Sequence, residues 1–128
     1  MTLALVGYLL VQARRPDKWF GKVFARVMNQ SHQNLTDWGL HHVTIERRFK
    51  VLDIGCGGGA TIRKMAAIAA EGVVYGIDYA EGSIAVSREL NSRLIETGRV
   101  VIQKGSVSQL PFPADYFDLA TAIETQYY

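Results

Sequence analysis

Four glycines and one acid between positions 53 and 59 form the stretch of this chain best suited to chemistry. The sequence there runs Asp-Ile-Gly-Cys-Gly-Gly-Gly. Glycines let the backbone turn sharply and approach a ligand with no Cβ in the way. Residues 51–54 predict a short buried strand, and residues 61–70 carry apolar side chains at helical spacing. A strand, a glycine turn and a helix in succession direct N–H groups at the helix start toward a ligand above the turn.

Two kinds of ligand fit such a turn, and Asp53 distinguishes between them. Gly55, Gly57 and Ala60 satisfy the pattern G-x-G-x-x-G/A of dinucleotide-binding folds, which is a weak match by itself. A pyrophosphate gains nothing from a carboxylate at the end of the strand beneath it, whereas a cationic ligand does. We therefore favour a cationic ligand and keep a dinucleotide-dependent oxidoreductase as the lesser alternative. A turn that binds nothing is disfavoured, because so many glycines cost backbone entropy.

Length and composition narrow the class of protein. The 128 residues allow one domain at most, and the hydrophobic content of 48% with 20% charged residues is ordinary for a soluble globular protein. A net charge of +2 is too small to indicate a nucleic-acid partner. The single cysteine, Cys56, excludes an internal disulfide and predicts a reducing compartment, the cytoplasm. Within the glycine turn we interpret it as a small filler rather than a nucleophile.

Residues 1–48 are interpreted as an N-terminal helical segment that precedes a main domain at 49–128. The apolar run 3–11 is too short to span a bilayer, which needs about 20 residues. It predicts a helix packed on the domain or on a partner, with an interfacial membrane contact as the lesser alternative. Apolar residues at 20, 23, 24 and 27 predict an amphipathic helix, and Thr36 with Asp37 predicts the cap of another short helix.

Metal binding is not predicted. His32, His41 and His42 have no accompanying cysteine or acid at metal-ligand spacing, and adjacent histidines in a helix point to different sides. We interpret them as packing or surface residues.

The second half of the chain alternates strand and helix. Residues 73–78 predict a second strand that ends in Asp78, close to where dinucleotide folds place an acid that binds the ribose hydroxyls. This position indicates a ribose-bearing ligand without separating the two ligand classes, and an acid that caps the next helix is the alternative. One crossover helix is predicted over 81–96. Strands are predicted over 100–102 and 117–123.

The pattern Asp-x-Gly-x-Gly-x-Gly, filled from Asp53 to Gly59, resembles motif I of the class I S-adenosylmethionine-dependent methyltransferases. Leu110-Pro111-Phe112 followed by Phe117-Asp118 resembles a frequent companion of that motif, so the resemblance covers residues 51–123. It implies an α/β, Rossmann-like three-layer sandwich with a mainly parallel sheet, whose strands lie in the spatial order third, second, first, fourth. It also implies S-adenosylmethionine as cofactor, whose ammonium and sulfonium centres account for the acid.

The resemblance further implies a set of residues that bind the cofactor. They are Asp53, Gly55, Cys56, Gly57, Gly59, Asp78, Tyr79, Ser106 and Val107. Tyr79 is expected against the adenine, and residues 105–112 resemble the loop that holds this base in small-molecule methyltransferases. That loop commonly carries an acid after its glycine, where this chain has Ser106. Its hydroxyl, or the Val107 backbone, would then bind the base with less charge assistance.

The reaction implied is methyl transfer to a small-molecule nucleophile, for which the protein supplies mainly position and a dry site. No catalytic residue is assigned; the resemblance puts Glu124 near the transferring methyl, and a polar strand end is an equal alternative. The family's sheet has seven strands and this chain supplies four, so we expect a truncated form or fragment. The alternative is a non-catalytic cofactor-binding fragment. An open edge on the fourth strand would favour self-association.

Overall fold

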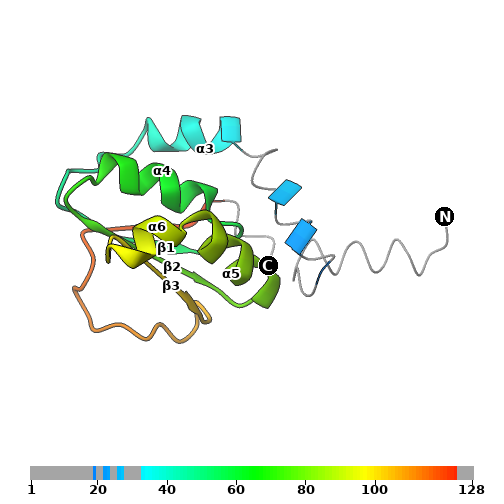
Figure 1. Cartoon of the computed structure of the whole chain (residues 1–128). Coiled ribbons are helices and arrows are strands. Elements are labelled where there is room, and N and C mark those ends of the chain that lie inside the picture. The colour runs from blue at the N-terminus through cyan, green and yellow to red at the C-terminus, as the bar shows by residue number, and fades with distance from the viewer. Residues whose placement is uncertain (1–18, 20–21, 24–25, 28–32, 124–128) are drawn as a thin grey trace.

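The computed structural model describes residues 19, 22–23, 26–27 and 33–123 (Figure 1). The short stretches before residue 33 are helical. The complete elements, in chain order, are α3 (Gln33–Leu40), β1 (Lys50–Ile54), α4 (Ala60–Ile68), β2 (Val73–Asp78), α5 (Glu81–Leu90), α6 (Ser92–Glu96), β3 (Val100–Lys104) and β4 (Leu119–Thr121).

The four strands form one parallel sheet in the order β3-β2-β1-β4, as predicted. Leu52 of β1 lies between Tyr75 of β2 and Ala120 of β4 in the register. Parallel neighbours need long crossover connections, and here α4 and the α5–α6 pair supply them. The α/β, Rossmann-like class is therefore confirmed. Within the described residues β4 pairs with β1 alone, and self-association through its other edge stays a prediction.

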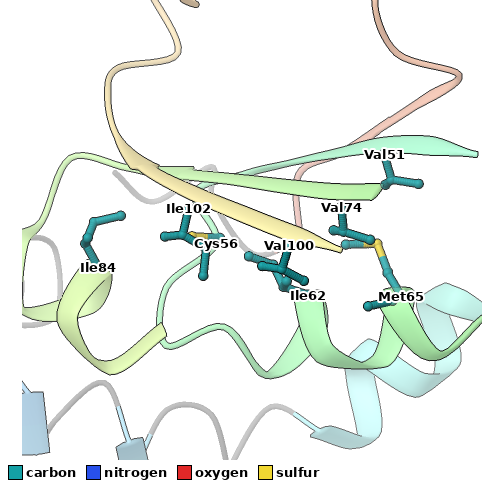
Figure 2. Close-up of a cluster of buried hydrophobic side chains, with 9 residues drawn as sticks. Val51, Cys56, Ile62, Met65, Val74, Ile84, Val100 and Ile102 are labelled. Atoms are coloured by element: carbon teal, nitrogen blue, oxygen red, sulfur yellow. The ribbon is translucent and has the colours of Figure 1, made fainter. Parts of the chain in front are cut away.

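The core lies between the sheet and the helices α4 and α5, which cover the same face (Figure 2). Valines of three adjacent strands, at positions 51, 74 and 100, point from the sheet toward Ile62 and Met65 of α4. The opposite face of β2 carries Tyr75, which packs edge-on against rings of the loop after β3. The described residues thus supply the sheet, one helical layer and an aromatic loop on the other face.

The helical predictions need three corrections. The helix predicted over 81–96 is interrupted at Asn91, whose ψ of 17° leaves the helical path. Thr36 is a buried residue inside α3 and does not cap a helix, because α3 begins at Gln33. The apolar face of the amphipathic helix predicted from positions 20, 23, 24 and 27 is not buried at Val23 and Val27, which are both exposed. The predicted helix over 3–11, with its membrane contact, lies outside the described residues, and so does His32. The domain boundary at 48/49 stays a prediction.

None of the helices in the described part of the chain combines the length and apolar character needed to cross a membrane. His41 and His42 lie in the turn after α3, where each ring makes a hydrogen bond to a main-chain carbonyl four residues earlier.

Candidate functional site

The loop between β1 and α4 has the conformation that its glycines predict. Gly55, Gly57 and Gly59 have φ angles of 69°, 54° and 85°, in the left-handed region that side chains with a Cβ rarely adopt. The loop is attached to the neighbouring strand, because the Cys56 N–H donates to the Ile77 carbonyl at 2.9 Å. The chain therefore turns tightly above the carboxyl end of β1, where parallel sheets generally bind ligands.

Asp78 joins this loop to the end of β2. One carboxylate oxygen accepts the Gly57 N–H at 2.9 Å, and the other accepts the Ala80 N–H at 2.9 Å. Ala80 is the residue before α5, so the two alternatives predicted for Asp78 overlap: it supports the start of a helix and borders the glycine loop. A third main-chain N–H, that of Tyr79, also interacts with this carboxylate, which has about four acceptor sites, so one site remains for a ribose hydroxyl.

The loop after β3 approaches the same edge of the sheet. Its Gly105 N–H donates to the Asp78 carbonyl at 2.9 Å, which brings Ser106 and Val107 next to the end of β2. The Ser106 and Ser108 hydroxyls are hydrogen-bonded at 2.8 Å, and the Val107 side chain is 63% exposed. Tyr79 is half-buried beside Asp78. The structure therefore brings the predicted residues of all three loops to one edge.

Asp53 occupies a different position from the other predicted residues. Its side chain is only 2% exposed, on the face of β1 that α4 covers. Thr121 of β4 donates its hydroxyl to the Asp53 carboxylate at 2.8 Å. Asp53 therefore lies beneath the glycine loop, and its predicted role in ligand binding stays a prediction. Sequence reasoning missed Thr121, because only the β1–β4 register brings it beside Asp53.

The electrostatic environment disfavours further negative charge. Burial raises the pKa of Asp53 to about 7, the Thr121 hydrogen bond opposes this rise, and the charge of Asp78 adds to it. Burial also raises the pKa of Asp78, against hydrogen bonds from main-chain N–H groups. The pKa of the buried Cys56 thiol is raised well above its usual range, by burial and by both carboxylates. This neutral thiol fits the filler role, and the two acids favour a cationic ligand.

The sequence that builds this site matches a known family. The model of the family described as "Methyltransferase domain" matches residues 51–128. The chain belongs to this methyltransferase family. The match begins in β1 and includes the glycine loop, Asp78 and the loop after β3, as the resemblance to motif I implied.

Curated relatives and solved structures that are similar to this chain include the following three. A demethylmenaquinone methyltransferase of Symbiobacterium thermophilum is 35% identical over 72 residues, which cover 56% of this chain and 29% of the relative. The (+)-O-methylkolavelool synthase of Herpetosiphon aurantiacus is 30% identical over 96 residues, which cover 75% of this chain and 34% of the relative. A SAM-dependent methyltransferase from Aquifex aeolicus shares the fold with a TM-score of 0.68 at 20% identity, covering 79% of this chain and 55% of its own. The matched part of this chain thus spans about a third of the length of these two curated relatives.

One further loop contact depends on a glycine that the predictions overlooked. Gly76 of β2 lies beside Asp53 in the register, and a Cβ built on it would fall 2.2 Å from Ile62 Cδ1 and 3.1 Å from Cys56 Sγ. Only glycine lets α4 and the loop approach the strand this closely. An isolated glycine inside an apolar strand was the available signal. Glu124, predicted near the transferring methyl, lies outside the described residues.

Proposed function

We propose that this chain forms the cofactor-binding half of an S-adenosylmethionine-dependent methyltransferase whose acceptor is a small molecule. The observation that carries the proposal is a left-handed glycine loop placed over one buried carboxylate, Asp53, and beside a second, Asp78. Two acids with raised pKa values disfavour a pyrophosphate and favour a ligand with positive charge. The family match and the SAM-dependent solved structure support the same cofactor.

The residues present fit the parts of this cofactor. The glycine loop, with Gly55, Cys56, Gly57 and Gly59, would hold the amino-acid end, and the Asp53 charge would attract the cationic centres. Asp78 would accept a hydrogen bond from a ribose hydroxyl at its remaining acceptor site.

The adenine would lie among the remaining predicted residues. Tyr79 would contact the ring, and Ser106 with the Val107 backbone would bind its edge. Both serine and valine are exposed, so this part of the site is open toward solvent. When bound, the cofactor supplies a methyl group that is already activated on sulfur. The chain's own part in the reaction is therefore orientation and exclusion of water.

A small-molecule acceptor and a cytoplasmic location belong to the same proposal. The two relatives reported above carry the names of small-molecule enzymes, a demethylmenaquinone methyltransferase and a methylkolavelool synthase. The buried, unpaired Cys56 is consistent with a reducing compartment. A dinucleotide-dependent oxidoreductase remains disfavoured, because its pyrophosphate would lie over the Asp53 charge.

Calorimetric titration of the purified chain with S-adenosylmethionine tests the proposal, with Asp78→Asn as the variant and Glu96→Gln as the matched control. Asp78→Asn keeps the side-chain shape but removes the charge, and we expect about a 10- to 100-fold loss of affinity, the magnitude of a charged hydrogen bond. Glu96 is an exposed residue of α6, and its substitution should leave binding unchanged. Equal affinities for the parent chain and Asp78→Asn would contradict the assigned role of Asp78, and no binding by a folded chain would contradict the proposed cofactor.

A further inference from the structure

Two polar side chains at the C-terminal end of α5, those of Ser87 and Asn91, are buried behind the glycine loop. Ser87 is 0% exposed and Asn91, which follows the last residue of α5, is 1% exposed. A helix face that packs on a core is ordinarily apolar, because burying an amide or a hydroxyl is unfavourable unless it is hydrogen-bonded. These two residues therefore require a reason other than packing.

The Asn91 amide connects α5 to the loop. Its Nδ2 donates to the Gly59 carbonyl at 3.1 Å and to the Ser87 carbonyl at 2.9 Å. The second bond returns to the last turn of α5 and fixes the amide relative to the helix. The first reaches a residue 32 positions earlier, at the junction of the glycine loop and α4. The interruption between α5 and α6 lies at the residue that makes these bonds.

Gly59 is in direct contact with this pair. A Cβ built on Gly59 would lie 2.3 Å from Ser87 Oγ and 2.7 Å from Asn91 Nδ2. Ser87 is also close to the other side of the loop, since its hydroxyl opposes the rise in the pKa of the Cys56 thiol. One turn of α5 thus supports the glycine loop at both Cys56 and Gly59.

Packing alone does not explain the chemistry of this contact. Asn91 Oδ1 is buried without a hydrogen-bond partner in the part of the chain that the structure describes, and Ser87 Oγ has no partner there beyond its weak interaction with the Cys56 thiol. An apolar residue of similar size would avoid these unmade bonds. What an apolar residue cannot supply is the donor to the Gly59 carbonyl.

We infer that Asn91, supported by Ser87, is a positioning residue for the cofactor loop. It holds the Gly59 carbonyl and thereby sets the direction of the α4 N-terminus and of the loop above Asp53. It does not contact the ligand; its effect passes through Gly59. The inference rests on the proposed function, because the loop it positions is the one assigned to S-adenosylmethionine.

The main test compares Asn91→Ala with Val100→Ala. Val100 is a core residue at the amino end of β3, away from the loop, so its truncation controls for lost stability. Affinity for S-adenosylmethionine is measured by calorimetry, and hydrogen exchange of the amides of residues 57–62 is measured without ligand. We expect Asn91→Ala to lose at least about tenfold in affinity and to exchange these amides faster, while Val100→Ala binds within about twofold of the parent chain.

A second variant provides a readout that a merely structural role would not change. Asn91→Asp keeps the size of the side chain, and its carboxyl group donates to the Gly59 carbonyl only when protonated. Its affinity deficit relative to the parent chain at the same pH should therefore shrink between about pH 8 and about pH 5. A pH-independent deficit contradicts the inference, and so do unchanged affinity and exchange in Asn91→Ala. If the parent chain binds no S-adenosylmethionine, the proposed function fails, and the exchange comparison still decides whether Asn91 holds the loop.

Discussion

Replacing Asp53 with asparagine should make the chain more stable at alkaline pH while weakening its ligand site. Asp53 is 2% exposed, and burial raises its pKa from the ordinary value of 3.8 to about 7. Between these two values the folded protein retains a proton that the unfolded chain releases. The free energy of unfolding therefore falls as pH rises through this window, and the loss is complete above about pH 7.

The magnitude follows from the same two values. A difference of about 3 between the folded and unfolded pKa, at 1.36 kcal/mol for each unit, gives about 4 kcal/mol as an upper estimate. The asparagine side chain of the variant is not ionisable, and its carbonyl oxygen can still accept the Thr121 hydroxyl. The free energy of unfolding of Asp53→Asn, relative to the parent chain, should thus rise by up to about 4 kcal/mol between about pH 4 and pH 8.

Urea unfolding at a series of pH values, followed by circular dichroism, measures this difference. Asp78 is present in both chains, so the effect of its own burial cancels in the comparison, and its repulsion of Asp53 is already contained in the Asp53 pKa of about 7. A difference that stays constant with pH, or that falls as pH rises, would refute the argument that Asp53 is buried beside a second carboxylate. The same variant should bind S-adenosylmethionine more weakly, because the negative charge beneath the loop is gone.

Two further predictions concern how the sheet holds the loop and α4. Gly76→Ala should destabilise the chain by about 1–3 kcal/mol, because the new methyl group would overlap Ile62 Cδ1. The control is Gly39→Ala, where the new methyl group would have no atom within 4 Å and the effect should be neutral or slightly stabilising. Thermal unfolding measures both variants, and equal melting temperatures would contradict the close approach at Gly76. Arg99→Ala should lower the free energy of unfolding by about 2–4 kcal/mol, because the guanidinium donates to three main-chain carbonyls at the end of α4 and in the following turn. The matched control is Arg93→Ala, at an exposed arginine. A loss of stability no larger than that of the control would argue against this capping role.

The parts of the fold and site that could be predicted are those encoded locally. Three left-handed glycines after an apolar strand fix the loop, because few other residues adopt that backbone conformation. Asp78 could be located by its place at the end of the second strand. The parallel order of the strands follows from the alternation of strand and helix together with the family's topology.

What could not be predicted depends on contacts between distant residues. Asp53 accepts a hydrogen bond from Thr121, which lies 68 positions later in the sequence. The burial of Asp53 and its raised pKa therefore cannot be predicted from the glycine motif alone. Helical periodicity continues through residues 81–96, so it gives no sign of the interruption at Asn91, whose amide donates to the distant Gly59 carbonyl. Leu90, the last residue of α5, is 38% exposed.

The central claim is that the glycine loop and its two acids form a site for a cationic nucleoside ligand. The most direct measurement is calorimetric titration of the folded chain above about pH 7, where Asp53 is ionised, with S-adenosylmethionine and with NAD in parallel. The account predicts saturable binding of S-adenosylmethionine and much weaker binding of NAD. Preferential binding of NAD would contradict it.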